Sequence, residues 1–416
     1  MNRMKKGAAV LLAVCIAVTG VLAGCGSSRT DTSSAGGTSV TSASSAESGK
    51  SSAEAGSSAG TETSASAQKA PQIQGLTYQS TVKLDYATQY QVYKYKGGYA
   101  LIQIEKEGKF LLVPEGKKAP AGLNSKITVI QQPKNIYLAA TASMALFASM
   151  DALDTVTMTS LDEKGWSFDA PKKALKSGKM KYAGKYNQPD YEMLLGNNCD
   201  LAIESTMIYH TPEVQEMIKD LGIPVLVDRS SYESNPLGRT EWIKLYGVMT
   251  GHEKEADAFF AEQEKKIESI RDFKNTEKTV AFFYISTDGK AVVRSSTDYV
   301  PTMIEMAGGR YIFKNATDKS GSSSVPMTVE KFYDIASDAD YIVYNGSIDS
   351  SVKTLKDLLQ KDPVLKNMKA VKNGRCWITG SSMYQRTDIV GNMILDFHKL
   401  FTEDNPSDLQ FLTKLQ

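Results

Sequence analysis

The chain has 416 residues, of which 48 are Lys or Arg and 47 are Asp or Glu, so its formal net charge is only +1. A nearly neutral chain offers no electrostatic basis for binding nucleic acid. The four cysteines are scattered, and a disulfide between Cys199 and Cys376 is not expected because nothing in the predicted fold brings them together.

The N-terminus has the parts of a secretory signal peptide, with a cationic start at Lys5-Lys6 and an apolar stretch over residues 8–21. A membrane-spanning anchor is the competing interpretation, since about 18 apolar residues can cross a bilayer, but no basic cluster follows as a stop signal. Leu22-Ala23-Gly24-Cys25 resembles the bacterial lipobox, in which the signal is cut before the cysteine and the thiol is acylated. We therefore expect residues 1–24 to be a signal peptide and Cys25 to carry palmitate or a similar lipid.

Residues 25–70 are rich in Ser, Ala, Gly and Thr and contain few large apolar residues. Such a segment cannot bury enough surface to offset the entropy of ordering it, so we expect a disordered linker. Its root-mean-square length is about 35–40 Å on the scaling of Gly/Ser chains. A tether of this length on a lipidated cysteine predicts a location on the extracellular face of the cell membrane, as in Gram-positive bacteria.

Residues 71–118 alternate apolar or aromatic residues with polar ones. The alternation is clearest over 90–95 and 99–104, and Gly97-Gly98 separates these two runs. A period of two residues is typical of strands joined by tight turns. We expect a small β-rich extension that packs on the first lobe.

From about Ile127 the pattern changes to short apolar strands separated by helices. Pro212 follows a capping hydroxyl and starts a predicted helix that ends at Gly222. The strands expected in this region are 136–139, 155–158, 201–203 and 224–227. Such alternation predicts a mostly parallel sheet covered by helices, and we assign residues 119–252 to a first α/β lobe.

A helix without internal Pro or Gly is predicted over about 254–273, and we assign 253–275 to a connecting helix. The alternation then restarts, which assigns 276–416 to a second α/β lobe. Its expected strands are 279–285, 291–294, 341–344 and 376–379, with helices after Tyr299, Val329, Leu355 and Asp388. The predicted fold is α/β, with two Rossmann-like lobes joined by a single long rigid helix and a small β-rich N-terminal extension.

Two segments at corresponding places in the lobes share one order of residues. Pro189–Ile203 and Thr328–Val343 each contain a Glu, an apolar helix, an Asp and an apolar strand, with two more residues between Glu and Asp in the second. This order resembles solute-binding proteins, with a helical backbone between their lobes, that serve ABC importers of iron siderophores, haem and cobalamin. The resemblance extends from Lys126 to the C-terminus and implies a monomeric receptor that works with an ABC permease and its ATPase.

The resemblance also implies how the protein meets its permease. In this family one glutamate on the rim of each lobe pairs with permease arginines, and Glu192 and Glu330 match those places. Exposed ion pairs are worth only about 0–1 kcal/mol each, so they would fix orientation more than strength. The alternative is that both are first-turn glutamates favoured by the helix dipole.

Ligands of open α/β sheets bind beyond the carboxyl ends of the strands, where this chain places arginines and aromatic residues. Arginine offers a fork for carboxylate or catecholate oxygens, and aromatic rings offer wide contact area, which favours a bulky planar or anionic chelate over a sugar. Local pairing or solvation of each residue is the alternative. The candidate ligand-binding residues are Trp166, Tyr209, His210, Arg239, Trp242, Arg294, Tyr299, Tyr384, Gln385 and Arg386.

The ligand class stays open between an iron chelate and a tetrapyrrole. Haem would take an axial ligand such as Tyr209, His210 or Met383. Bare zinc or manganese is disfavoured because it needs three or four preorganised ligands and only His210 is near a candidate loop. We expect no direct metal site and no resident cofactor.

Two functions of other classes compete with transport. The sequence contains no Gly-x-Ser-x-Gly, Walker, His-Glu-x-x-His or Cys-x-x-Cys motif in the folded region, so no enzyme is expected, although motifs alone do not exclude a carbohydrate-active enzyme. A surface adhesive or structural lipoprotein fits the tether but not the repeated α/β pattern. The prediction is therefore a substrate-binding lipoprotein that captures a ferric siderophore between its lobes, with haem or cobalamin as the alternative ligand.

Overall fold

The computed structural model describes residues 70–318, 322–404 and 406–416. The expected signal peptide, the expected lipidation site at Cys25 and nearly all of the expected linker lie outside these residues. Within them, no helix has both the length and the apolar character needed to span a bilayer.

The β-rich extension is a five-stranded sheet in the order β1-β2-β3-β4-β5, antiparallel except for the parallel pair β4 and β5. Its strands are β1 (Tyr78–Thr81), β2 (Tyr90–Tyr95), β3 (Tyr99–Ile104), β4 (Gly108–Val113) and β5 (Ile127–Gln131). Alternation gives the sheet two apolar faces. Val92 and Ile102 join the core of the first lobe, whereas Tyr93 and Leu101 form a small separate cluster with Ile73. The sheet therefore continues beyond residue 118, because β5 adds to its edge.

The first lobe is built on a parallel sheet in the order β12-β11-β6-β7-β8, as the alternating pattern predicted. Its strands are β6 (Ile136–Leu138), β7 (Val156–Thr159), β8 (Lys181–Tyr182), β11 (Leu201–Ser205) and β12 (Val225–Asp228), and β9 (Gly184–Lys185) pairs separately with β10 (Gln188–Pro189). The helices are α1 (Met144–Ser149), α2 (Asp169–Lys176), α3 (Tyr191–Gly196) and α4 (Pro212–Asp220), with short 3-10 turns η1 (Leu153–Thr155), η2 (Glu163–Gly165), η3 (Thr206–His210) and η4 (Ser230–Tyr232). Ile203 on β11 faces α1 and α5, and its neighbour Ala202 faces α3 and α4.

Two packed helices lead from the first lobe towards the second. They are α5 (Pro236–Thr250), which is almost wholly buried, and α6 (Glu253–Glu268). The chain reverses at Gly251, whose φ of 80° suits glycine. A Cβ on Gly247 would lie 2.7 Å from the Cβ of Ala256, so glycine allows the close approach of the two helices.

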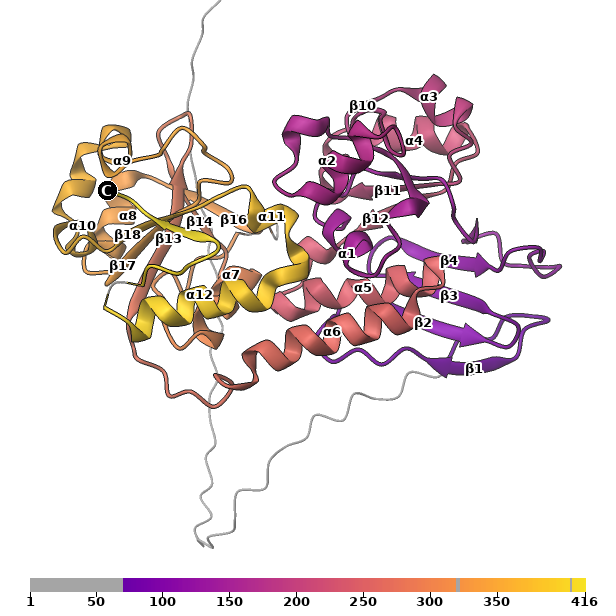
Figure 1. The fold of residues 1–416 in the computed structure, drawn as a ribbon, viewed down its shortest axis with the longest axis horizontal. Helices are drawn as coiled ribbons and strands as arrows, with labels where there is room; N and C mark the ends of the chain where they lie inside the picture. Colours follow the sequence, from indigo (N-terminus) through magenta and orange to yellow (C-terminus); the bar gives the residue numbers. More distant parts are fainter. Residues whose placement is uncertain (1–69, 319–321, 405) are drawn as a thin grey trace, which may run out of the picture. The chain divides into compact units, whose positions relative to one another are not determined.

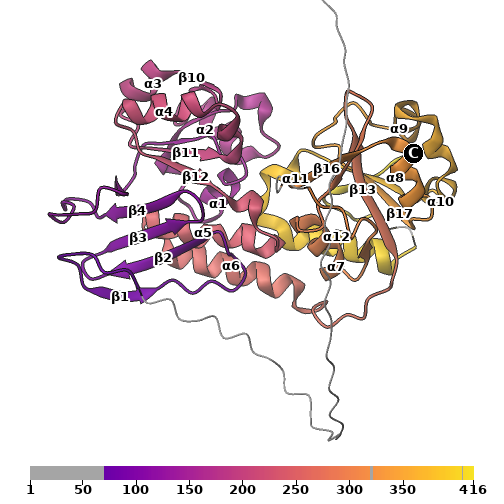
Figure 2. The same cartoon turned by 180° about the vertical axis from the view of Figure 1, so that it is seen from behind.

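The connecting helix is shorter than predicted. It ends at Glu268, and turns then carry Ile270 into the core of the second lobe and Phe273 edge-on to His398 at 4.5 Å between ring centroids. The helix therefore ends before residue 273, because Ile270 and Phe273 pack on the second lobe through turns instead of continuing the helix. Helices α5 and α6 run beneath the first lobe and contact α12 (Val390–Thr402), which lies along the second lobe (Figures 1 and 2).

The second lobe has a seven-stranded mixed sheet in the order β16-β14-β13-β17-β18-β19, with β15 also paired to β13. Its strands are β13 (Thr279–Ile285), β14 (Ala291–Arg294), β15 (Arg310–Tyr311), β16 (Ser324–Met327), β17 (Tyr341–Tyr344), β18 (Cys376–Thr379) and β19 (Leu412–Lys414). Only β13, β15, β17 and β18 are parallel, and β14, β16 and β19 pair antiparallel at the edges. The edges of this sheet are therefore antiparallel. β14 follows β13 in a hairpin, whereas helices lie between β14 and β16 and between β18 and β19.

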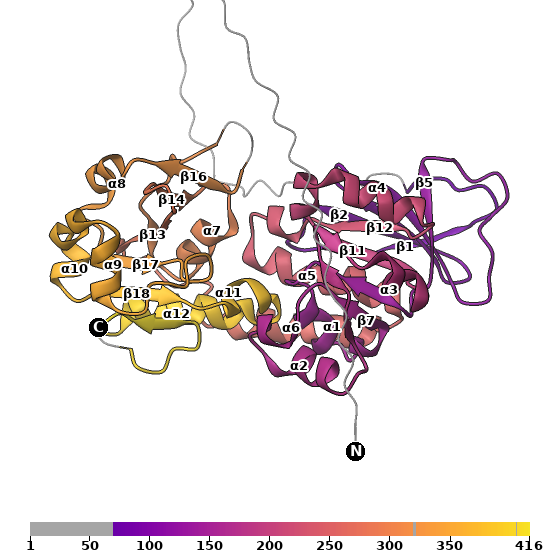
Figure 3. The same ribbon diagram turned by 90° about the horizontal axis from the view of Figure 1, so that it is seen from above.

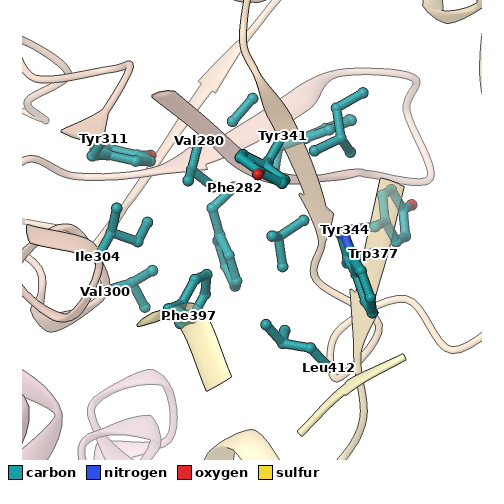
Figure 4. Close-up of a cluster of buried hydrophobic side chains, with 14 of the residues drawn as sticks. Val280, Phe282, Val300, Ile304, Tyr311, Tyr341, Tyr344, Trp377, Phe397 and Leu412 are labelled. Atoms are coloured by element: carbon teal, nitrogen blue, oxygen red, sulfur yellow. The ribbon is translucent and has the colours of Figure 1, made fainter. Parts of the chain in front are cut away.

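Helices cover the second sheet and bury a large aromatic core. They are α7 (Tyr299–Met306), α8 (Val329–Ala336), α9 (Leu355–Lys361), α10 (Lys369–Lys372), α11 (Ser382–Gln385) and α12, with 3-10 turns η5 (Pro363–Asn367) and η6 (Thr387–Ile389). Figure 4 shows Phe282 of β13 beside Phe397 of α12, with Tyr344 and Trp377 in the same cluster. The sheet of the extension lies beneath the first lobe next to α5 and α6 (Figure 1), and its turns extend on the side away from the second lobe (Figure 3).

Candidate ligand-binding site

A cavity of about 590 Å³ lies where the two lobes face each other. The first lobe supplies the residues that follow β6, β11 and β12, which are the carboxyl ends of its parallel strands. The second lobe supplies Tyr384 of α11 and the segment before β16. The lining residues are Ala140, Thr141, Ala142, Ser205, Thr206, Met207, Tyr209, His210, Asp228, Ser230, Ser231, Tyr232, Arg239, Ser322, Ser323 and Tyr384.

Arg239 is the cation that lines this cavity from α5. The residue is only 4 % exposed, and its guanidinium carbon lies 4.1 Å from the centroid of the Tyr299 ring on the opposite lobe. Its Nε has no hydrogen-bond acceptor, and no carboxylate in the described part of the chain forms an ion pair with it. A buried guanidinium without an acid partner leaves donors available to an anionic ligand.

Asp228 lines the same cavity, but its carboxylate is occupied within the first lobe. Tyr246 donates to its Oδ2 at 2.7 Å, the backbone N–H of Ser230 donates to its Oδ1 at 2.6 Å, and Ser143 also donates to it. Burial and the neighbouring Asp228 raise the pKa of Tyr246 well above its usual value, so the phenol remains a donor. Asp228 forms no ion pair with Arg239 within 4.0 Å.

A second arginine, Arg229, lies behind two tyrosines of the cavity wall. Its guanidinium carbon is 4.3 Å from the centroid of the Tyr232 ring, and its Nη1 donates to the hydroxyl of Tyr209 at 3.1 Å. Tyr209 in turn donates to Glu107. Burial, followed by the hydrogen bond to Glu107, raises the pKa of Tyr209 to about 12. In the described residues Arg229 also has no direct carboxylate partner.

The predicted arginines of the second lobe do not line the cavity, because nearby carboxylates bind them. Arg294 donates from Nε and Nη2 to Asp298 at 3.0 and 2.6 Å, and Asp298 also caps α7. Arg386 forms the same forked pair with Asp388, with both contacts at 2.8 Å. Neither arginine lines the cavity in this structure, so a contact of either with the ligand stays a prediction.

Three further predicted contacts are internal. Trp242 is fully buried in the first lobe, and its Nε1 donates to Glu233 at 2.9 Å. Trp166 is also buried and packs edge-on to Phe168. Tyr299 is buried beneath Arg239 and orients that side chain rather than facing the cavity.

Gln385 connects the lobes instead of lining the cavity. Its Oε1 accepts from the N–H of Ser167 at 2.7 Å, and its Nε2 donates to the carbonyl of Gly165 at 2.8 Å. Met383 is buried in the second core, so it is not placed to be an axial ligand. Of the predicted ligand contacts, the structure brings together Tyr209, His210, Arg239 and Tyr384.

Three residues in or behind the cavity wall were not among the predicted contacts, namely Arg229, Tyr232 and Met207. All three follow the carboxyl ends of β11 or β12, so the rule that identified Tyr209 could have identified them. Tyr384 is held towards the cavity because its hydroxyl accepts from Nδ2 of Asn345 at 2.8 Å.

The two predicted docking glutamates occupy equivalent places in their lobes. Glu192 and Glu330 are exposed in the first turns of α3 and α8, each of which begins with a side-chain cap, from Asp190 and Thr328 respectively. Both therefore also fit the helix-dipole alternative. Their contact with a permease stays a prediction.

Two other predicted features concern metals and thiols. Over residues 70–318, 322–404 and 406–416, no cluster of three or more His, Cys, Asp or Glu side chains is arranged to hold a metal ion. Cys199 and Cys376 are both free.

Comparisons with known proteins agree with this architecture. An uncharacterized lipoprotein of Methanocaldococcus jannaschii is 28% identical over 293 residues, which cover 67% of this chain and 68% of that protein. An ABC transporter substrate-binding protein from Listeria monocytogenes has a similar fold, with a TM-score of 0.51 at 14% identity over 66% of this chain and 100% of its own. A periplasmic haem-binding protein from Pseudomonas aeruginosa gives 0.53 at 16% identity over 68% of this chain and 98% of its own.

The family model for periplasmic binding proteins matches residues 142–382, which include most of both α/β lobes and the helices α5 and α6. Proteins of this type bind substrates for ABC transporter permeases and are not enzymes. The chain belongs to the periplasmic binding protein family.

Proposed function

We propose that the protein captures an anionic iron chelate, a ferric siderophore, in the cavity between its lobes and delivers it to the permease of an ABC importer. The observation that carries this proposal is Arg239, a buried cation on the cavity wall without a carboxylate partner among the described residues. A buried unpaired charge is costly, so a site that retains one is suited to a ligand of opposite charge.

The remaining wall fits the same class of ligand. Tyr209, Tyr232 and Tyr384 offer aromatic surface, and Ser230 and Ser323 offer small polar groups. The volume of about 590 Å³ is within the range of about 300–1,000 Å³ typical of small-molecule sites. An oxygen-rich chelate can accept hydrogen bonds from the guanidinium and pack its flat ligand rings on the tyrosines.

Haem is the second candidate, and a specific arrangement favours it. Tyr209 and His210 both line the cavity and are residue types that bind haem iron. The guanidinium of Arg229 would stabilise a phenolate at Tyr209 once iron displaced its proton. The haem-binding protein from Pseudomonas aeruginosa shares the fold, which supports haem only by analogy.

Lipid anchoring belongs to the same proposal. Cys25 follows the lipobox-like Leu22-Ala23-Gly24, and the relative from Methanocaldococcus jannaschii is named a lipoprotein. The Ser-rich segment after Cys25 would keep the receptor close to its permease on the extracellular face of the membrane.

A thermal-shift screen tests the ligand proposal. Ferric tricatecholate and trihydroxamate chelates, haemin and cyanocobalamin are each added to the mature protein. A ligand at 100 times its dissociation constant adds about 2.7 kcal/mol to stability, which shifts the melting temperature by several degrees. Stabilisation by a ferric chelate but not by its iron-free form supports siderophore capture. Stabilisation by haemin alone selects the second candidate, and no shift with any member contradicts both.

The docking role of Glu192 and Glu330 is tested by the double alanine variant. Uptake of the chelate by cells should be lost while its affinity for the purified protein stays unchanged. Glu213→Ala is the matched control, because Glu213 is an exposed first-turn glutamate on α4. Normal uptake by the double variant, or a loss in the control as well, would contradict the assignment.

A further inference from the structure

A short strap of the extension, residues Asp85–Gln89, lies directly on α5 beside the cavity. Two buried carboxylates of the first lobe bind its backbone. Glu241 accepts from the N–H groups of Asp85, Tyr86 and Ala87 at 2.9, 2.8 and 2.7 Å. Glu233 accepts from the N–H groups of Thr88 and Gln89 at 2.8 and 3.0 Å.

The strap approaches α5 closely because the helix has a glycine at the crossing. A Cβ at Gly238 would lie 3.0 Å from the carbonyl oxygen of Tyr86. Gly238 immediately precedes Arg239, so the strap crosses α5 at the turn that supplies the cavity cation. Because charge-assisted hydrogen bonds to backbone N–H groups are among the stronger ones, the strap is a rigid part of the lobe.

Two side chains of the extension, Gln89 at the end of the strap and Glu107 outside it, contact residues of the cavity wall from behind. The Oε1 of Gln89 accepts from Nε and Nη2 of Arg229 at 3.4 and 3.3 Å, and Glu107 in the turn between β3 and β4 accepts from Tyr209. Arg229 joins the two contacts, because its Nη1 donates to Tyr209. The chain of contacts therefore runs from Gln89 through Arg229 and Tyr209 to Glu107.

We propose that the β-rich extension is part of the binding site, in which Gln89 and Glu107 are positioning residues that hold Arg229 and Tyr209 in the conformation that receives the ligand. The inference rests on the proposed function, since it concerns the same cavity. The extension lies outside residues 142–382, the part of the chain that the family model matches.

The physical reason is preorganisation. Arginine and tyrosine on loops lose side-chain freedom when they bind a ligand, and holding them beforehand reduces that loss. The 3-10 turn that carries Tyr209 has five residues, and Tyr209 itself is 40% exposed, so its own lobe constrains it weakly. The acceptor on Glu107 and the stacking of Arg229 on Tyr232 supply the missing restraint.

The experiment compares Gln89→Ala, Glu107→Ala and the double variant with wild type in the mature protein. Glu107→Gln keeps an acceptor for Tyr209 and is the conservative rescue. Glu105→Ala is the matched control, because Glu105 is an exposed carboxylate two residues away. Hydrogen exchange of segments 206–210 and 229–232 is measured without ligand, and haemin and a ferric tricatecholate are then titrated by tryptophan fluorescence.

We expect the double variant to exchange about fivefold faster in both segments and to bind the probe about five- to tenfold more weakly, as the loss of one or two hydrogen bonds implies. Glu107→Gln and Glu105→Ala should behave as wild type, and all variants should melt within a few degrees of it. Unchanged exchange in the double variant, or unchanged affinity despite faster exchange, overturns the inference. Failure of both probes to bind wild type counts against the proposed function, while the exchange measurement still decides whether the extension holds the wall.

Discussion

The two lobes differ in whether the arginines near the cavity between them are paired with carboxylates. In the second lobe Arg294 and Arg386 are each paired through two contacts with an aspartate. In the first lobe Arg229 and Arg239 have no such partner among the described residues. The buried Asp, Glu and Arg side chains with an atom that lacks a hydrogen bond in the described chain also belong to the first lobe, namely Asp200, Glu204 and Arg239.

The difference shows that an arginine at the end of a strand is not by itself a ligand contact. Asp298 follows Arg294 by four residues and Asp388 follows Arg386 by two, so each pair closes within its own loop. Arg239 lies on a helix whose nearby acid, Glu241, is turned towards the strap of the extension. The position of the nearest free carboxylate decides whether a guanidinium stabilises the fold or meets the ligand.

The largest expected effect is on stability, from Arg294→Ala. The variant leaves the side chain of Asp298, which is 1% exposed, without its partner, and breaking a buried pair costs about 3–5 kcal/mol. Urea denaturation measures the loss, and the affinity for the chelate should not change. Arg310→Ala is the control, because its pair with Glu277 is exposed and is worth at most about 1 kcal/mol. If the variant kept its stability but lost its affinity for the chelate, Arg294 would be a ligand contact rather than a structural residue.

The second prediction concerns Glu204, which is fully buried on β11 with both carboxylate oxygens unpartnered. Burial raises its pKa to about 8. Because the folded state holds the proton more tightly than the unfolded state, stability is greatest below the unfolded pKa. It then falls by about 1.4 kcal/mol per pH unit until the pH passes the folded pKa.

Glu204→Gln should remove that slope, so that the variant gains about 2–3 kcal/mol over wild type between pH 5 and pH 7. Urea denaturation at several pH values gives the difference, in which the contributions of other titrating groups cancel. Glu213→Gln, at an exposed site on α4, should follow wild type. Parallel curves for Glu204→Gln and wild type would show that Glu204 is charged in the folded protein.

The third prediction tests the free cation of the first lobe. Arg239→Ala should weaken binding of an anionic chelate by about 1.5–3 kcal/mol, roughly 10- to 150-fold, because it removes charge-assisted hydrogen bonds. Fluorescence titration measures the affinity, and Arg271→Ala, outside the cavity, is the control. Equal affinities for Arg239→Ala and Arg271→Ala would mean that the ligand binds elsewhere.

The smallest effect is expected for the ring beneath Arg239. Tyr299→Leu removes the stacking at 4.1 Å and should weaken binding by about 0.5–1 kcal/mol. Tyr299→Phe keeps the ring and removes a buried hydroxyl without a partner, so affinity should be retained and stability should not fall. A larger loss for the Phe variant than for the Leu variant would assign the role to the hydroxyl instead.

Short-range patterns predicted the framework well. β13, β14, β17 and β18 begin and end at the expected residues, because each is an apolar run bounded by polar residues or glycine. The end of α6 was not predictable in this way. Ile270 and Phe273 have helical spacing, but they pack on the second lobe through turns, which depends on tertiary contacts.

Of the residues at the site, the sequence predicted only some of those that follow the carboxyl ends of the parallel strands. The rule that ligands bind beyond parallel strands identified Tyr209 and Arg239. Trp242 was also predicted to be a ligand contact, but it is fully buried, and its burial depends on which face of α5 meets the sheet. The contacts of Gln89 and Glu107 join residues more than 100 positions apart in the chain. Local sequence patterns do not predict contacts of this length, so the proposed role of the extension could be inferred only from the three-dimensional structure.

The most direct test is a crystal structure of the mature protein with the iron chelate that gives the largest thermal shift, in which anomalous scattering locates the iron. We expect the iron in the cavity lined by Tyr209, Arg239 and Tyr384, with an oxygen of the chelate or a haem carboxylate on the Arg239 guanidinium. Iron bound outside this cavity, or a ligand that leaves Arg239 without contact, would contradict this expectation.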